Sequence, residues 1–414
     1  MVAPKLRFKE FDGDWKEDTL KNCITSIDSG WSPQCESYPA NSNEWGVLKT
    51  TSVDWSGFNS SFNKKLPLEL TPRNEIEVKP LDILVTRAGP TERVGVISVV
   101  PHSVRSKLMI SDKLIRLKAN EQNNPLFLGI SLSSVKCQNQ LQSKTSGLAK
   151  SQTNISQKIL GEVLLKLPSK EEQTKIASFL SAVDEKISQL TKKNQLLSQY
   201  KQGMMQKLFS QQLRFKADDG SEFGEWKEKK LSEICLKIKD GTHFSPKTFE
   251  VGEYKYLTSK NVKNGYLDFS NLEFVSADDH KKIYSSCDVK FGDVLLTKDG
   301  TIGQCCVNTL TEEFSLLSSV AFLRLKSEFN NYFLYHILLS DLGQKEINGV
   351  IAGQALKRIT LTKINDFKFM FPCLEEQTKI ANFLSAIDQK IDVVVQQIEQ
   401  AKTWKKGLLQ QMFV

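Results

Sequence analysis

The chain of 414 residues is too long for one hydrophobic core, and its length predicts two to four domains. With 40% hydrophobic and 25% charged residues it is typical of a folded globular protein, which excludes a disordered tail. No apolar run reaches the roughly 18–20 residues that a membrane helix requires, and the eight cysteines and four histidines lack zinc-binding spacing. We therefore expect free thiols and a cytoplasmic location. The net charge of +8 is compatible with an anionic partner without identifying nucleic acid.

Residues 1–168 are predicted to form a first α+β domain. The stretches "LDILVTRAGPTERVG" (81–95) and "LIRLK" (114–118) are typical of strands joined by glycine-containing turns. The stretch "NNPLFLGISLSSV" (123–135) favours short helices. Strands and helices mixed in this way predict an α+β fold.

Residues 169–210 are predicted to form one long helix after Pro168. Ser169 and Glu172 make an S-x-x-E capping box at its start. The apolar residues then follow a heptad seam, which comprises Ile176, Leu180, Val183, Ile187, Leu190, Leu197, Met204 and Leu208. Asn194 and Lys201 interrupt this seam, either to fix the register of a partner helix or because the helix end frays. A helix of about 39 residues would be about 58 Å long at ~1.5 Å per residue, and it needs a partner to be stable.

Residues 211–372 repeat the plan of the first domain with different loops. The stretch "GDVLLTKDGTIG" (292–303) parallels 81–95, "FLRLK" (322–326) parallels 114–118, and "NNYFLYHILLSDL" (330–342) again favours short helices. By contrast, "GWSPQCESYPANSNEWG" (30–46) has no counterpart in "DGTHFSPKTFEVGEYKYL" (240–257). Similar scaffolds with unlike loops indicate two related domains that recognise different things.

Residues 373–414 are predicted to form a second long helix that copies the first. "EEQTKIANFLSAIDQKI" (375–391) repeats "EEQTKIASFLSAVDEKI" (171–187) at fourteen of seventeen positions, 204 residues later (375 − 171). Cys373 replaces the capping serine, so this helix should start less firmly. Ala401 and Lys405 interrupt its seam. Because domain termini are often close together, the second helix should run back along the first and form an antiparallel two-helix coiled coil with internal pseudo-twofold symmetry.

A catalytic site is not evident in the sequence. There is no G-x-x-x-x-G-K-[ST] phosphate loop and no Asn-Pro-Pro-aromatic methylation signature. "KDGTH" (239–243) is interpreted as a turn, and His336 as a packed helix residue. We therefore expect a binding protein that has no catalytic residue, metal or cofactor of its own.

This order of domains and helices, with its duplicated Pro-x-x-Glu-Glu-Gln helix starts, resembles the specificity (S) subunit of type I restriction-modification systems. "GDVLLTKDGTIG", "DGTHFSP" (240–246) and "WGVLKTTSVDWSG" (45–57) also resemble segments of its target-recognition domains. The resemblance implies a non-catalytic subunit in which each target-recognition domain reads one half of a split, asymmetric DNA target. It also implies that the helical pair serves as a spacer on which two modification (M) subunits dock.

In such complexes the M subunits bind S-adenosylmethionine and methylate adenine, and up to two restriction (R) subunits use ATP and Mg²⁺ to translocate and cleave DNA. The sequence leaves an alternative open, namely a coiled-coil adaptor without DNA specificity. A methyltransferase fused into one chain is disfavoured, because no cofactor site is found.

Candidate DNA contacts are polar and basic residues in loops beside the predicted strands. Lys and Arg pair with phosphates, while Asn, Gln and Arg can contact base edges. The candidates are Lys49, Thr50, Arg87, Arg93, Lys150 and Gln152 in the first domain, and Thr258, Lys260, Asn261, Lys298, Gln354, Lys357 and Arg358 in the second. Each has the alternative of being a solvated surface group.

Candidate partner-docking residues lie on the faces expected to be exposed at the two helix starts. They are Glu171, Gln173 and Lys175, with Glu375, Gln377 and Lys379. The alternative is that they are ordinary polar residues of a first helical turn.

Overall fold

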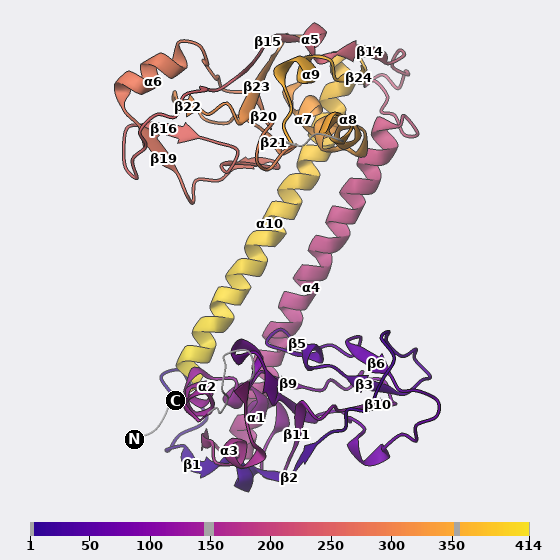
Figure 1. Ribbon diagram of the computed structural model, residues 1–414, viewed down its shortest axis with the longest axis vertical. Helices are drawn as coiled ribbons and strands as arrows, with labels where there is room; N and C mark the ends of the chain where they lie inside the picture. Colours follow the sequence, from indigo (N-terminus) through magenta and orange to yellow (C-terminus); the bar gives the residue numbers. More distant parts are fainter. Residues whose placement is uncertain (1–3, 145–152, 352–356, 414) are drawn as a thin grey trace. The chain divides into compact units, whose positions relative to one another are not determined.

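The computed structural model describes residues 4–144, 153–351 and 357–413, and it divides into two compact units (Figure 1). Unit 1 comprises Met1–Gln189 and Ile398–Val414, and unit 2 comprises Leu190–Gln397. These boundaries fall inside the two long helices, whereas the sequence placed the domain boundaries at the helix starts. The difference arises because each helix end packs on an α+β domain and shares its core.

Unit 1 is built on a four-stranded antiparallel sheet with the strand order β2-β11-β7-β9. Its strands are β2 (Ile24–Ser29), β7 (Ile83–Thr86), β9 (Ile97–Val99) and β11 (Leu114–Ala119). All four residues of β7 are buried, so the expected "DILVT" strand lies inside the sheet with both faces covered.

Smaller sheets of two or three strands and short helices surround this sheet. The strands are β1 (Lys16–Thr19), β3 (Gly46–Leu48), β4 (Val53–Asp54), β5 (Gly57–Phe58), β6 (Asn63–Lys65), β8 (Ala88–Gly89), β10 (Leu108–Met109), β12 (Thr153–Asn154) and β13 (Leu164–Leu167). The helices are α1 (Pro125–Leu132), α2 (Val135–Ser143) and α3 (Gln157–Gly161), with 3₁₀ turns at Leu20–Cys23, Thr50–Ser52, Asn74–Ile76 and Thr91–Arg93. Asn124 caps α1 by accepting hydrogen bonds from two backbone N–H groups, and proline follows at the first helical position.

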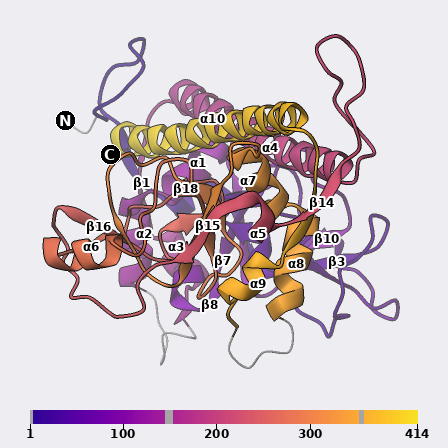
Figure 2. The same ribbon diagram turned by 90° about the horizontal axis from the view of Figure 1, so that it is seen from above.

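Unit 2 repeats this plan with the sheet order β15-β23-β20-β21. Its strands are β14 (Lys227–Lys230), β15 (Cys235–Asp240), β16 (Tyr254–Leu257), β17 (Val262–Lys263), β18 (Tyr266–Leu267), β19 (Glu273–Val275), β20 (Val294–Thr297), β21 (Cys305–Val307), β22 (Ser315–Leu316), β23 (Val320–Leu325) and β24 (Lys368–Phe371). Its short helices are α5 (Leu231–Ile234), α6 (Ala277–Tyr284), α7 (Asn331–Leu339), α8 (Asp341–Ile351) and α9 (Leu361–Asn365). Figures 1 and 2 show α6 beside β16, in a part of unit 2 where unit 1 has only a 3₁₀ turn.

The strand register corrects one alignment made from the sequence. "LIRLK" and "FLRLK" suggested that Leu114 corresponds to Phe322. However, Leu114 pairs with Thr86 at the end of β7, and Val320 pairs with Thr297 at the end of β20. Leu114 therefore corresponds to Val320, and the matching letters mask a shift of two residues.

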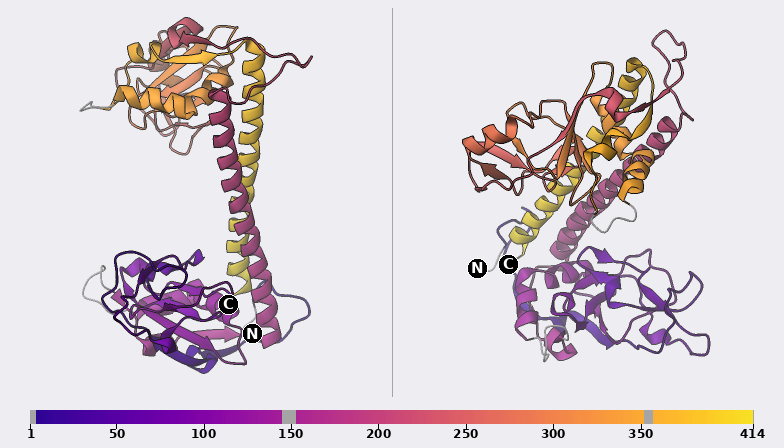
Figure 3. Two further views of the ribbon diagram at one scale, coloured as in Figure 1. Left: turned by 90° about the vertical axis from the view of Figure 1, so that its right-hand side faces the viewer. Right: turned by 45° about the horizontal axis from the view of Figure 1, so that its top comes forward.

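The two long helices are α4 (Lys170–Phe209) and α10 (Leu374–Met412), and each contributes one segment to each unit. In unit 1, Lys405 of α10 pairs with Asp184 of α4, and in unit 2, Lys201 of α4 pairs with Asp388 of α10, with N–O distances of 2.5 Å in both pairs. Both residue sums are equal (405 + 184 = 589 and 201 + 388 = 589), as antiparallel helices require. Figure 3 shows the α4 and α10 segments side by side in both units.

Most of the seam of these helices is buried, as the heptad pattern predicted, while Ile187, Leu197, Met204 and Ile391 are half-buried. Ile176 and Leu180 are buried in unit 1, and Ile380 and Leu384 are buried in unit 2. The interruptions at Lys201 and Lys405 supply the two ion pairs between the helices. This supports the register alternative over fraying at those two positions.

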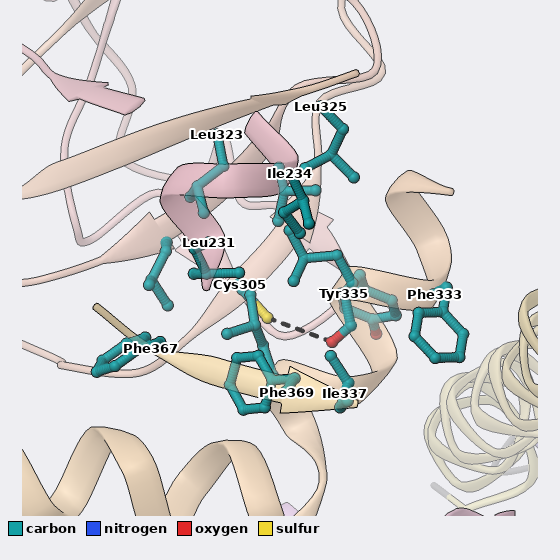
Figure 4. Close-up of a cluster of buried hydrophobic side chains, with 14 of the residues drawn as sticks. Leu231, Ile234, Cys305, Leu323, Leu325, Phe333, Tyr335, Ile337, Phe367 and Phe369 are labelled. Carbon is teal, nitrogen blue, oxygen red and sulfur yellow. Dashed lines mark hydrogen bonds between the residues drawn. The ribbon is translucent and has the colours of Figure 1, made fainter. Parts of the chain in front are cut away.

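The largest core of unit 2 joins the sheet, α7 and the long helices. Figure 4 shows Leu231, Cys305, Tyr335 and Phe369 converging from α5, β21, α7 and β24, with a sulfur–oxygen hydrogen bond of 3.8 Å from Cys305 to the backbone oxygen of Tyr335. Burial raises the pKa of the Cys305 thiol well above its ordinary value, so this thiol is an inert core group.

Candidate nucleic-acid interface

Three loop segments of unit 2 meet at one surface. Lys298, directly after β20, donates its backbone N–H to the Ser319 backbone oxygen at 2.9 Å, and its own carbonyl accepts the Ile359 N–H at 2.9 Å. The Ser319 hydroxyl accepts the Ser259 N–H at 3.0 Å. The turn 258–261, the turn 298–300 and the segment 357–359 are therefore connected, and we call them the unit 2 loop surface.

Lys298 does not lie open on this surface. It is 2% exposed, and its ammonium pairs with Asp240 at the end of β15, with an N–O distance of 2.9 Å. The expectation that Lys298 contacts DNA directly is therefore not supported, since reaching a phosphate would leave Asp240 buried without its cation.

Asn261 is also buried, at 3% exposure. Its side-chain oxygen accepts the Thr258 N–H at 2.9 Å, and its amide nitrogen donates to the Asp268 backbone oxygen at 3.0 Å. Both ends of the amide thus build the turn, and the buried side chain is not presented to a base edge. Of the other candidates, Lys260, Lys357 and Arg358 are exposed, Thr258 is half-buried, and Arg358 lies 3.9 Å from Asp299.

In unit 1 the corresponding loops are held by Arg93. Its guanidinium donates to Asp54 at 2.5 Å, to the Val53 backbone oxygen at 2.7 Å and to the Thr50 backbone oxygen at 3.3 Å. Hydrogen bonds from Ser56 and from Arg93 lower the pKa of Asp54. Arg93 therefore fixes the β4–β5 hairpin to the turn before it, rather than pointing a free cation outward.

Arg87 is the more available cation of unit 1. It is half-buried, and its guanidinium makes two long hydrogen bonds of 3.4 Å, to Asn154 and to the Ser29 hydroxyl. Bonds of this length are weak. Lys49 and Thr50 are half-buried in the turn after β3. Together, the segments 49–54, 86–93 and 153–155 form the unit 1 loop surface.

Three further candidates, Lys150, Gln152 and Gln354, lie outside the described residues.

Sequence reasoning missed two features in or directly beside these surfaces. Trp55 is 51% exposed in the turn between β4 and β5, and Tyr266 is 61% exposed at the start of β18 in the equivalent hairpin. Turn signals around each aromatic residue, in "DWSG" and "NGY", would have marked them. The second feature, the Asp240–Lys298 pair, has no local signal because its partners come from different strands.

The predicted docking residues divide into exposed and buried groups. Glu171, Lys175 and Glu375 are exposed, and Lys379 is half-buried. Lys175 pairs with Glu10, and Lys379 pairs with Asp218 at 2.5 Å.

The expectation that Gln173 and Gln377 lie on an exposed face is wrong, because they are 2% and 1% exposed. The Gln173 side-chain oxygen accepts the Asn124 N–H at 2.9 Å, and that of Gln377 accepts the Asn330 N–H at 2.9 Å. Each glutamine thereby ties a long helix to the N-cap of α1 or α7.

The second glutamate of each Glu-Glu-Gln motif is also internal. Arg7 donates two hydrogen bonds of 2.7 Å to Glu172, and Arg214 donates at 3.1 and 2.7 Å to Glu376. The two glutamates are 1% and 0% exposed. The repeated motif is therefore first of all a joint between each long helix and the domain of its unit.

One cluster in unit 2 has the residue types of a hydrolase. His336 lies 3.1 Å from the Ser385 hydroxyl and 4.0 Å from Asp388. However, His336 is 0% exposed, and burial lowers its pKa to about 3. An imidazole with this pKa is too weak a base to activate a serine at neutral pH, so the cluster is a packing feature, as the sequence indicated for His336.

Across residues 4–144, 153–351 and 357–413, no helix is long and apolar enough to cross a membrane. Within those same ranges, no three His, Cys, Asp or Glu side chains gather closely enough to hold a metal ion.

Comparison with known proteins shows which family has this architecture. Residues 51–199 and 224–403 match the family model described as "Type I restriction modification DNA specificity domain". The type I restriction enzyme EcoEI specificity subunit of Escherichia coli is 41% identical over 166 residues, which span 40% of this chain and only 28% of that protein. The MjaVIII specificity subunit of Methanocaldococcus jannaschii is 28% identical over 73% of each chain.

Two solved structures share the fold. The S subunit of a type I restriction-modification system from M. genitalium aligns with a TM-score of 0.65 and 16% identity over 100% of this chain and 99% of that chain. A structure described as showing complex assembly and conformational transition of the type I R-M system aligns with a TM-score of 0.52 and 16% identity over 98% of both chains.

Proposed function

Because this chain belongs to the family of type I restriction-modification DNA specificity domains, we propose that it is the non-catalytic subunit that selects the DNA sequence for such a complex. The observation that carries the proposal is the pair of loop surfaces. Each unit presents a set of connected turns at one end of its four-stranded sheet, with exposed or half-buried cations suited to phosphates.

We further propose that the two units read unlike half-sites, so that the target is bipartite and asymmetric. The units share sheet order and register, which supports a common docking geometry. Their loop surfaces differ, since unit 1 presents Arg87 and Lys49 where unit 2 presents Lys260, Lys357 and Arg358.

The long helices are proposed to act as the spacer and as the docking site for two M subunits. The support is the duplication at 204 residues, which gives two near-equivalent helix starts with Glu171 and Glu375 exposed. One solved structure with this fold is described as showing complex assembly of the type I R-M system. S-adenosylmethionine would then be bound by the M subunits, and ATP with Mg²⁺ by up to two R subunits, in a cytoplasmic complex.

Duplex-DNA binding by the chain with its M partner tests the proposal. We expect log K to fall linearly with log salt, with a slope of about −0.9 per phosphate neutralised. Mapping methylated adenines in DNA from cells that express both subunits would then give the bipartite target.

Arg87→Ala should weaken binding, whereas Lys21→Ala provides a matched control, because Lys21 is an exposed lysine beside α3. Salt-independent binding, or none, would leave the coiled-coil adaptor as the better interpretation. Methyl transfer by the purified chain alone would instead indicate a fused enzyme.

A further inference from the structure

The ion pair between Lys298 and Asp240 is an unusual feature for a binding surface. Both side chains are nearly buried, at 2% and 10% exposure. Removing two charges from water is costly, and such pairs seldom stabilise a fold relative to well-packed neutral residues. A lysine beside a DNA-reading surface would be expected to remain in solvent, where its charge can meet phosphate.

The fold itself does not require this pair, because unit 1 does without it. Thr86 and Thr297 end equivalent strands, so Arg87 and Lys298 occupy equivalent positions. Ser29 and Asp240 are likewise equivalent at the ends of β2 and β15. In unit 1 the Arg87 guanidinium thus makes a 3.4 Å hydrogen bond to the uncharged Ser29 hydroxyl, where in unit 2 the Lys298 ammonium makes a 2.9 Å ion pair with Asp240.

The pair lies at the point where the unit 2 loops are connected. The Lys298 carbonyl accepts a hydrogen bond from Ile359, which is next to the exposed Arg358. The Lys298 N–H donates to the backbone oxygen of Ser319. The Ser319 hydroxyl in turn accepts a hydrogen bond from Ser259, which is next to the exposed Lys260. Gly300 packs closely here as well, with a positive φ of 73°. A Cβ at Gly300 would lie 2.9 Å from the Ser259 hydroxyl oxygen.

We propose that the Lys298–Asp240 pair is a positioning element, through which Lys298 sets sequence discrimination by unit 2 without touching DNA. This inference rests on the proposed function. A bidentate contact to a base edge requires donor and acceptor to lie within a narrow range of distances. A flexible lysine can follow a phosphate over a wider range. A loosened loop surface therefore loses discrimination before it loses phosphate contacts.

The test uses the full chain in complex with its M partner and three duplexes: the mapped target, and the target with either half replaced. For each variant we measure the ratio of affinities for intact and half-replaced duplexes, and the salt dependence of binding. Lys298→Met should reduce the ratio of affinities about tenfold or more for one of the two half-replaced duplexes and leave the other ratio unchanged. A reduction of this size is expected when one base contact is lost. The salt slope of this variant should stay within about 0.5 of the wild-type value, because no phosphate contact is removed.

The matched control is the equivalent residue of unit 1. Arg87→Met should move the salt slope toward zero by about 0.9 and weaken binding to all three duplexes alike, as expected for a lost phosphate contact. Lys298→Arg, which keeps the charge opposite Asp240, should retain most of the discrimination.

Should Lys298→Met fail to fold, the double variant Asp240→Ser with Lys298→Arg installs the arginine–serine arrangement of unit 1. It should fold and bind DNA with relaxed discrimination at the same half. A fall in salt slope of about 0.9 with intact discrimination would make Lys298 a phosphate contact and overturn the inference. Unchanged discrimination in both variants would also overturn it. Absence of salt-dependent binding by the wild-type complex would instead refute the proposed function itself.

Discussion

Arg7 in unit 1 and Arg214 in unit 2 each bind a buried glutamate with two hydrogen bonds. Arg87 and Lys298 also occupy equivalent positions, yet one is half-buried with weak contacts and the other is buried in an ion pair. The parts of the two units that hold the helices are therefore alike, and the parts that form the two loop surfaces differ. The contrast separates residues that maintain the fold from residues that distinguish the two units.

The largest effect is expected at the two helix joints. Arg7→Ala and Arg214→Ala each leave a buried carboxylate without its cation, which should lower the free energy of unfolding by about 3–5 kcal/mol. Glu376 would keep a 3.1 Å hydrogen bond from the Trp226 indole, whereas the Trp15 indole N–H of unit 1 has no hydrogen-bond partner within the described ranges. We therefore expect Arg7→Ala to cost about 1 kcal/mol more than Arg214→Ala.

Denaturant unfolding of the full chain measures both losses. The control is the double variant Arg7→Ala with Glu172→Gln, which removes the carboxylate charge together with its arginine. It should be more stable than Arg7→Ala alone. A loss below about 1 kcal/mol in both single variants would show that the joints do not hold the helices.

The next largest effect is a pH dependence of the free energy of unfolding that arises from His336 in unit 2. Burial lowers the pKa of His336 to about 3 from its ordinary 6.5, so the stabilisation from the neutral imidazole is present above pH 6.5 and is lost as the pH falls toward 3. The free energy of unfolding should fall by up to about 1.4 kcal/mol per pH unit in that window. Burial raises the pKa of the neighbouring Asp388. Its contribution, present at low pH and lost as the pH rises through its folded pKa, opposes the loss at the acid end.

Ile130 occupies the corresponding position of α1 in unit 1, six residues after the N-cap asparagine. His336→Ile therefore gives unit 2 the residue of unit 1 and should flatten the acid dependence between pH 6.5 and 5. Equal acid dependence in the variant and the wild type would show that His336 is not the group responsible.

The two ion pairs between the helices offer a smaller contrast. Lys201 and Asp388 are 13% and 29% exposed, whereas Lys405 and Asp184 are 29% and 51% exposed. We expect Lys201→Met to cost about 1–2 kcal/mol and Lys405→Met about 1 kcal/mol or less, because solvent screens the more exposed pair. Thermal unfolding at low and high salt measures both. A larger loss of stability for Lys405→Met than for Lys201→Met would contradict the relative burial of the two ion pairs.

The smallest effect is expected at the start of α10. In unit 1 the Ser169 hydroxyl accepts the Glu172 N–H at 3.3 Å, while Cys373 stands at the matching position of unit 2. Cys373→Ser should therefore stabilise the chain by about 0.5–1 kcal/mol, and Ser169→Ala should cost a similar amount. Slower hydrogen exchange of the first turn of α10 would report the new cap, and unchanged exchange would show that none forms.

The sequence alone determined the repeated architecture. The duplication at 204 residues and the heptad seam predicted two long helices, and the structure confirmed their antiparallel pairing within each unit. These features were predictable because they depend on periodicity along one chain, which a sequence displays directly. The short helices within 123–135 and 330–342 and the buried strands were predicted from local patterns of the same kind.

Only the tertiary structure decided which polar side chains face solvent. Gln173, Gln377, Asn261 and Lys298 looked like surface residues, and all four are buried. The partners of Gln173, Gln377 and Lys298 are distant in the sequence, as are Arg7 and Glu172, which lie 165 residues apart. Asn261 differs, because its partners Thr258 and Asp268 lie in the same turn region. The identity of a polar residue in a loop or a first helical turn does not indicate whether its side chain contacts water or a partner from another strand. Its environment is therefore fixed by the folding of the whole unit rather than by its neighbours in the chain.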